Sequence, residues 1–131
     1  MSPHRLELRV YYEDTDLAGI VYHANHLRFA ERGRSEWLRA LGIDQAALRE
    51  GGLTFAVTRM DCRWLAPARF DDLLTVETRP LRIGGARAEL SQRILRHEAP
   101  LFEAAVTVAA MGPTGRPARL PAGLRATPDG S

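Results

Sequence analysis

The residues best suited to chemistry are concentrated in one short stretch of the sequence, residues 11–25. This stretch places Asp14, Asp16 and His23 between the end of a predicted strand and the start of a predicted helix. Free backbone N–H groups and the dipole at a helix N-terminus stabilise developing negative charge. An acid or base beside such a site is typical of acyl transfer, although the spacing alone leaves hydrolysis, dehydration and simple ligand binding open.

Simpler roles compete for the same side chains. A lone Asp-x-Asp before a helix usually serves turn and capping chemistry, and we assign this structural role to Asp14. His23 and His26 could share a metal ion with Asp16 or Glu13, but such histidine pairs often arise by chance on adjacent helical turns. We therefore expect no metal site, while Asp16 and His23 remain candidates for a functional pair.

The composition excludes several other kinds of chemistry. All 18 basic side chains apart from histidine are arginine, which removes lysine nucleophiles and Schiff bases. Cys62 is the single cysteine, so an internal disulfide and a cysteine-rich zinc site are excluded. The sequence lacks the Gly-x-Ser-x-Gly motif that is typical of serine hydrolases. A net charge of +2 without a basic cluster argues against nucleic-acid binding.

Length and hydropathy predict one soluble domain. The 131 residues, of which 45% are hydrophobic, suit a single core that we assign to residues 1–111. No apolar stretch approaches the ~20 residues needed to cross a membrane, and the charged first residues offer no signal sequence, so we expect a cytoplasmic protein. Frequent glycine and proline predict a loose C-terminal tail over residues 112–131.

Hydrophobic periodicity predicts the elements that position the chemistry. Alternation of apolar and polar residues over positions 5–12 predicts a first strand. Apolar residues at helical spacing from about position 23 predict a long helix that ends at Gly42. Gly33 inside this helix indicates a place where another backbone comes close.

Four further strands are expected after the helix, at residues 55–64, 74–79, 87–94 and 102–110. The apolar phase slips by one near Thr58 or Arg59, as a β-bulge would produce. Gly84 and Gly85 predict the turn of a hairpin, and the last strand is expected inside the sheet because both its faces lose charge. Trp37 and Trp64 are expected in the core. The prediction is an α+β fold with a five-stranded, curved antiparallel sheet wrapped around one long helix.

Four segments of the sequence also carry a family resemblance: Val10–Asp16, Val21–Asn25, Glu31–Leu38 and Ala66–Asp72. Through them the chain resembles the hotdog-fold acyl-CoA thioesterases of the 4-hydroxybenzoyl-CoA thioesterase-like group, and within it the Tol-Pal-associated branch. The resemblance runs from Arg9 to about Met111, and it departs at His26, where the family usually has tyrosine. It implies hydrolysis of an acyl-CoA thioester, with a short or aromatic acyl group, to free acid and coenzyme A without a cofactor.

By this resemblance Asp16 is the catalytic carboxylate, His23 is the residue at the helix start, and Tyr12 is a further tyrosine of the site. A carboxylate can act as a nucleophile or as a general base for water, and the sequence does not decide between them. Coenzyme A brings phosphates, for which arginine is the natural partner. The candidate phosphate ligands are Arg59, Arg82, Arg87 and Arg116.

The resemblance also implies a homo-oligomer, either a dimer or a tetramer built from dimers. An edge left open by one curved sheet is a place where a second subunit can pair. Two other functions stay open: a non-catalytic module that binds acyl thioesters or an acyl carrier protein, and a dehydratase acting on 3-hydroxyacyl thioesters. Release of free thiol from acyl-CoA distinguishes hydrolysis from both.

Overall fold

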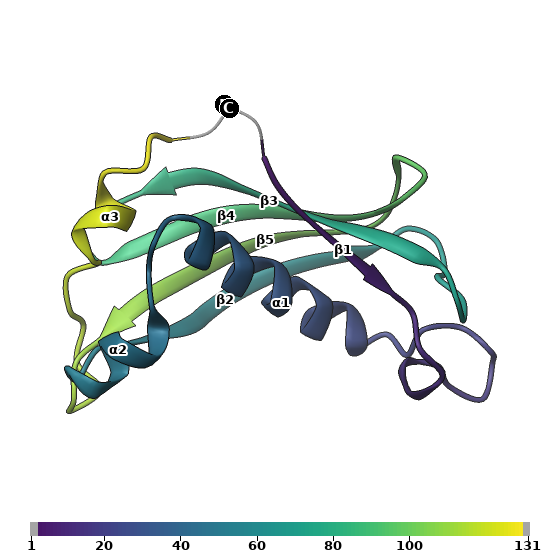
Figure 1. The fold of residues 1–131 in the computed structure, drawn as a ribbon, viewed down its shortest axis with the longest axis horizontal. Coiled ribbons are helices and arrows are strands. Elements are labelled where there is room, and N and C mark those ends of the chain that lie inside the picture. The colour runs from purple at the N-terminus through teal and green to yellow at the C-terminus, as the bar shows by residue number, and fades with distance from the viewer. Residues whose placement is uncertain (1–2, 130–131) are drawn as a thin grey trace.

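A computed structural model describes residues 3–129 and shows a curved antiparallel sheet wrapped around one long helix (Figure 1). The elements, in chain order, are β1 (His4–Arg9), the 3-10 helix η1 (Tyr12–Asp14), α1 (Asn25–Ala40), α2 (Gln45–Glu50), β2 (Thr54–Trp64), β3 (Leu73–Ile83), β4 (Arg87–Arg96), β5 (Ala99–Met111) and α3 (Ala122–Arg125). The five strands lie in the order β1-β3-β4-β5-β2, and every neighbouring pair is antiparallel. The predicted fold class, the β3–β4 hairpin and the interior place of β5 are confirmed.

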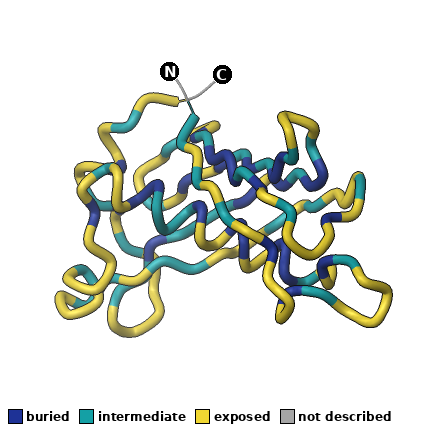
Figure 2. The backbone as a smooth tube through the Cα atoms, turned by 45° about the vertical axis from the view of Figure 1, so that its right-hand side comes forward, coloured by how far each residue is buried: buried dark blue, intermediate teal, exposed yellow. Residues whose placement is uncertain are grey.

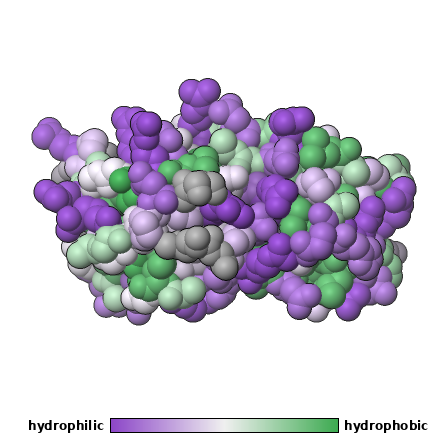
Figure 3. All heavy atoms as spheres, turned by 90° about the horizontal axis from the view of Figure 1, so that it is seen from above, coloured by the Kyte–Doolittle hydropathy of each residue, from purple (hydrophilic) through white to green (hydrophobic). Residues whose placement is uncertain are grey.

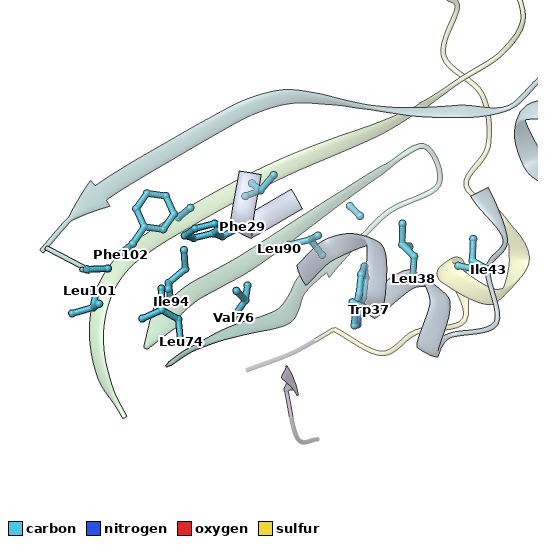
Figure 4. Packing of buried hydrophobic residues seen from close by; sticks show 14 of the residues in the cluster. Phe29, Trp37, Leu38, Ile43, Leu74, Val76, Leu90, Ile94, Leu101 and Phe102 are labelled. Carbon is cyan, nitrogen blue, oxygen red and sulfur yellow. The ribbon is translucent and has the colours of Figure 1, made fainter. Parts of the chain in front are cut away.

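The core lies between the concave face of the sheet and α1. Alternate residues of the strands point inward, and Val76, Leu90 and Phe102 are almost fully buried. Figure 4 shows Phe29 and Trp37 of α1 among these strand side chains. Burying apolar area of this kind contributes about 25 cal/mol per Å², which stabilises the helix against the sheet. Figure 2 shows exposed residues in the loops and also along the helices and strands, whose buried residues face the core.

Gly33 of α1 lies in close contact with the sheet. A Cβ atom at this position would lie 2.5 Å from Cγ1 of Val76, which is closer than real Cβ contacts. The predicted close contact at Gly33 is present, but the neighbouring atoms belong to side chains of β3 and β4 rather than to another backbone. The pairing of β2 with β5 also shifts register between Val57 and Arg59, which confirms the predicted bulge.

The outer face of the sheet is polar because charged residues cover it. Glu77 is 4% exposed and lies between Nη2 of Arg5 and Nη2 of Arg93, each 3.1 Å from its carboxylate. The arginine stems shield this carboxylate from water while their guanidinium groups compensate its charge. Seen from above, the molecule is largely hydrophilic, with its apolar residues in separate patches (Figure 3). Within residues 3–129, no helix is long and apolar enough to span a membrane.

Two boundaries predicted from the sequence are wrong. The first strand ends at Arg9 rather than Tyr12, because the side chain of Asp14 accepts the N–H of Tyr11 (2.7 Å) and turns the chain into η1. The helix begins at Asn25 rather than near position 23, at the residue whose side-chain amide donates to the carbonyl of Asp14 (2.9 Å). Both errors fall where hydrogen bonds between side chain and backbone override the apolar periodicity.

The expectation of a loose C-terminal tail is also corrected, for the residues up to Asp129. Leu120 and Leu124 are buried in the core, and α3 brings Leu124 there. The N–H of Leu120 donates to the carbonyl of Gly85 (2.7 Å), and the side chain of Asp129 accepts the N–H of Ile83 (2.8 Å). The buried side chains of Leu120 and Leu124 and these two hydrogen bonds hold the segment against the β3–β4 turn.

Candidate functional site

The turn that carries Asp16 is built from short backbone hydrogen bonds. The N–H of Asp16 donates to the carbonyl of Ile20 (2.9 Å), and the carbonyl of Asp16 accepts the N–H of Gly19 (3.0 Å). Gly19 has a φ of 80°, which few other residues adopt without strain. The Asp16 carboxylate accepts the N–H of Ala18 through Oδ1 (2.9 Å) and is exposed. The turn therefore fixes the direction of a carboxylate that faces solvent.

Asp14 ties this turn to the start of α1. Its backbone carbonyl accepts the N–H of Tyr22 (3.0 Å) and the side-chain amide of Asn25 (2.9 Å). Its carboxylate is buried and accepts the N–H of Tyr11 (2.7 Å). The structural role predicted for Asp14 is confirmed. Asn25 links the loop to the helix, which is the local hydrogen-bonding role that its place near the helix start favours.

The N-terminus of α1 has no side-chain cap. Ala24 occupies the N-cap position, and no side chain accepts a bond there. Among the described residues, no backbone acceptor lies opposite the N–H groups of His23 and Ala24. The carbonyl of His23 instead accepts Nε1–H of Trp64 (3.1 Å) and faces Nδ1 of His26 (3.2 Å). Free N–H donors at a helix N-terminus form a site for an anion or an oxyanion.

A pocket of about 440 Å³ opens beside these donors. Asp16, His23 and His26 line it together with Trp64 from the end of β2. The remaining lining residues are apolar or proline: Ile20, Val21, Leu65, Ala66 and Pro67. One pocket thus combines a carboxylate, an imidazole and free N–H donors with an apolar wall, which suits a small acyl thioester.

His26 and Trp64 form the inner wall of the pocket. The His26 ring is 3% exposed and stacks on Phe102 with ring centres 5.3 Å apart. Burial lowers the pKa of His26, so its imidazole is neutral at neutral pH. Trp64 is 47% exposed, so its expected place in the core is wrong, whereas Trp37 is buried as predicted. The reason is that the indole lies across the pocket and donates to His23.

Tyr12 is not part of this pocket. Its side chain is 85% exposed, and its ring meets Phe70 edge-on with ring centres 6.1 Å apart. It lines a neighbouring hollow with Arg9 and Asp71, which does not include Asp16 or His23. A catalytic role for Tyr12 stays a prediction.

The candidate phosphate ligands lie away from Asp16 within one chain. Arg82 and Arg87 flank the β3–β4 turn, which lies at the opposite end of the molecule from the start of α1 (Figure 1). The 16 residues of α1 alone span roughly 24 Å. Arg59 lies within β2 and pairs with Asp61 (3.2 Å). Within one chain, Arg82 and Arg87 do not line the pocket that holds Asp16.

Metal ligation finds no support in the geometry. Nδ1 of His26 faces a carbonyl oxygen, and its ring is enclosed by aromatic side chains. Across residues 3–129, no group of three or more His, Cys, Asp or Glu side chains is placed to hold a metal ion. The chemistry available at the pocket is that of a carboxylate, an imidazole and backbone N–H groups.

The sequence did not reveal how Trp64 and His26 contribute. Trp64 is 41 residues from His23 along the chain, and an indole in a strand pattern usually indicates core. A hint was present in the polar neighbours of Trp64, because Asp61 and Arg63 place this strand end at the surface. The substitution of His26 for the usual tyrosine was a second hint.

Comparison with known proteins gives consistent relatives. A family model described as the thioesterase superfamily matches residues 18–102, starting just after Asp16. The acyl-CoA thioesterase YbgC of Haemophilus influenzae is 45% identical over 103 residues, which cover 78% of this chain and 76% of that protein. The acyl-CoA thioester hydrolase YbgC of Escherichia coli is 42% identical over 110 residues, covering 83% and 82% of the two chains.

A solved structure resembles the whole fold. The crystal structure of a probable thioesterase from Bartonella henselae matches with a TM-score of 0.88 and 44% sequence identity. The match covers 92% of this chain and 100% of the other. The similarity therefore extends over most of the chain.

Proposed function

The chain belongs to the thioesterase superfamily, and we propose that it hydrolyses acyl-CoA thioesters with Asp16 as its catalytic carboxylate. Membership confirms the resemblance to hotdog-fold acyl-CoA thioesterases that the sequence motifs indicated. One observation carries the assignment of the site: the Asp16 carboxylate and the uncapped start of α1 line a single pocket. We also propose a cytoplasmic location, which a coenzyme A substrate suits.

In the proposed reaction Asp16 acts as a general base. It removes a proton from a water molecule, whose oxygen attacks the thioester carbonyl carbon. The negative charge that develops on the carbonyl oxygen is stabilised by the free N–H groups of His23 and Ala24 and by the N-terminal dipole of α1. The C–S bond then breaks, the sulfur of coenzyme A takes the proton held by Asp16, and the free acid remains.

Asp16 can alternatively attack the carbonyl carbon itself, so that the C–S bond breaks, coenzyme A leaves as its thiolate and a mixed anhydride forms; water then hydrolyses the anhydride to the free acid and restores the Asp16 carboxylate. The exposed position of its carboxylate and the single bond to Ala18 leave an oxygen free for either role. We favour the general base, because the pocket is open and a water molecule has room beside the carboxylate. The His23 imidazole is proposed to orient the substrate or the water.

We propose that two chains pair through β2. This strand has 11 residues and is an edge of the sheet, with Val57 and Trp64 half exposed along it. An open edge of this length is a template for a further strand, and two-fold pairing closes it. Pairs of such dimers then give the tetramer that the family resemblance implies. Light scattering tests the pairing, and a mass near 14.5 kDa would contradict it.

Antiparallel pairing through β2 also supplies an explanation for the distant arginines. The Trp64 end of β2 is bonded to His23, whereas its Thr54 end pairs with Met111 of β5, near the start of β4. Pairing reverses the partner end to end, so its β3–β4 turn approaches the pocket of the first chain. We propose that Arg82 or Arg87 of the partner subunit binds the coenzyme A phosphates. An acyl carrier protein offers the same type of thioester and is a second proposed substrate.

A panel of aliphatic and aromatic acyl-CoAs with detection of free thiol tests the proposed function. The expected result is thiol release from at least one substrate class. Binding without thiol release would favour a non-catalytic module instead. A change in enoyl-thioester absorbance without thiol release would favour a dehydratase.

A further inference from the structure

The carbonyl group of His23 is held by side chains from two different elements. Nε1–H of Trp64, at the end of β2, donates to it at 3.1 Å, and Nδ1 of His26 in α1 lies at 3.2 Å. In the first turn of α1, the N–H of Leu27 donates to the carbonyl of Ala24 (3.1 Å) rather than to the carbonyl of His23. The orientation of the peptide between residues 23 and 24 therefore depends on these two side chains.

Fixing a carbonyl also fixes the N–H of the same peptide. A trans peptide is planar, and its N–H points opposite to its C=O. The peptide before His23 is held because the carbonyl of Tyr22 accepts the N–H of Asn25 (2.8 Å). The peptide after His23 is held by Trp64 and His26. Both planes that flank His23 are thus fixed, and the free N–H groups of His23 and Ala24 have defined directions.

The protonation state of His26 fits this role. Because Nδ1 faces a carbonyl oxygen, Nδ1 carries the proton and Nε2 keeps its lone pair. Nε2 is buried without a hydrogen-bond partner. A phenyl ring would fill the space beside Phe102 and Phe29 without leaving such an atom unpaired. The polar atom of His26 that makes a contact is Nδ1, and that contact is with the backbone of His23.

We infer that His26 and Trp64 are positioning residues: by holding the carbonyl of His23 they fix the peptide between residues 23 and 24, so that the free N–H of Ala24 points, beside that of His23, at the thioester oxygen. The inference rests on the proposed hydrolysis and assigns a function to two side chains that have no part in the bond-breaking steps. Donors that are already oriented need no reorganisation as negative charge develops, and this contributes to the rate more than to ground-state binding.

Two substitutions at one position separate the hydrogen bond from packing. His26→Phe keeps an aromatic ring against Phe102 but removes the donor. His26→Asn keeps a donor at the position of Nδ1 but removes the ring. Trp64→Phe removes the second donor independently. Phe29→Leu is the control, because it alters packing around His26 and leaves both bonds to His23 in place.

The readouts are kcat and KM for thiol release from an acyl-CoA, with thermal unfolding of each variant. His26→Phe and Trp64→Phe are expected to lower kcat by about 10-fold to 100-fold while KM stays within about twofold. His26→Asn is expected to regain most of the lost kcat, and Phe29→Leu to lower thermal stability with kcat nearly unchanged.

The inference is overturned if His26→Asn is as slow as His26→Phe, or if His26→Phe keeps the wild-type kcat. These outcomes leave the proposed function standing, because the wild-type enzyme still releases thiol. A wild-type protein that releases no thiol from any acyl-CoA overturns the proposed function and this inference together.

Discussion

Gly33→Ala is predicted to destabilise the protein, although alanine is the better helix former. An ideal Cβ at this position lies 2.5 Å from Cγ1 of Val76 and 3.2 Å from both Nε2 of Gln92 and Oγ1 of Thr78. Gln92 also donates to the carbonyl of Ala30 (2.8 Å) and to Thr78 (2.9 Å). The added methyl group therefore presses on the buried atoms that join α1 to the sheet.

The expected size follows from opposing contributions. Replacing glycine by alanine within a helix stabilises it by about 1 kcal/mol. Overpacking in a filled core costs about 1–3 kcal/mol, and weakening a buried hydrogen bond adds about 1 kcal/mol or more. The net prediction is a loss of about 1–3 kcal/mol in the free energy of unfolding. In a chain of this length that lowers Tm by roughly 4–12 °C.

Thermal and urea unfolding followed by circular dichroism measure this loss. Gly85→Ala is the matched control, because a Cβ there meets no atom within 4 Å and its φ is not in the left-handed region. The control is expected to stay within about 0.5 kcal/mol of wild type. A Tm for Gly33→Ala equal to or above that of wild type would refute the close contact between helix and sheet.

Three further predictions concern charge. Burial pushes the pKa of Asp72 up, but bonds from the Arg69 N–H (2.8 Å) and Arg96 (2.7 Å) outweigh it and hold that pKa below its usual value. Urea titrations should therefore show Asp72→Asn losing roughly 1–2 kcal/mol near pH 7, with the difference from wild type shrinking below about pH 4. Burial lowers the pKa of His26, so the wild-type protein should lose stability as pH falls below about 6.5, because the unfolded chain then binds a proton that the folded state resists. The His26→Phe variant should lose less stability over the same pH range. Equal slopes of Tm against pH for the two proteins would contradict this prediction. Arg82→Ala or Arg87→Ala should raise KM for acyl-CoA more than for a short thioester without the nucleotide, and equal effects on both would remove these residues from the phosphate site.

Local pattern was sufficient to predict most of the fold. The alternation in β3, β4 and β5 predicts their inward faces because a strand has a fixed period of two. The slip near Thr58 predicts the bulge, since one extra residue reverses which face is apolar. Gly33 predicts a close contact because glycine in a helix interior needs a compensating reason.

Features that depend on distant contacts were not predictable in this way. The C-terminal segment is rich in glycine and proline, yet Leu120 and Leu124 anchor it to the core. Nothing local distinguishes these two leucines from exposed ones in a loop. Trp64 has the pattern of a core residue, and its bond to His23 appears only after β2 is brought beside the start of α1.

The same difference between local pattern and distant contacts applies to the residues of the candidate site. Asp16 and His23 lie close in sequence, so the strand, turn and helix that connect them bring both to one pocket. The family resemblance named this pair, and local sequence proximity explains why both side chains line the same pocket. Arg82 and Arg87 are remote in sequence and lie at the other end of the sheet, so no local pattern relates them to the pocket. Residue type alone could not place them.

The most direct test of the catalytic role of Asp16 is thiol release by Asp16→Asn compared with wild type. The amide keeps the size of the side chain and an oxygen that can accept the N–H of Ala18, but it removes the charge and the basicity. If Asp16 is the general base, kcat falls by at least ~100-fold while the unfolding temperature and the oligomeric state stay as in wild type. A folded, oligomeric Asp16→Asn that keeps most of the wild-type kcat would contradict the central claim that this carboxylate performs the hydrolysis.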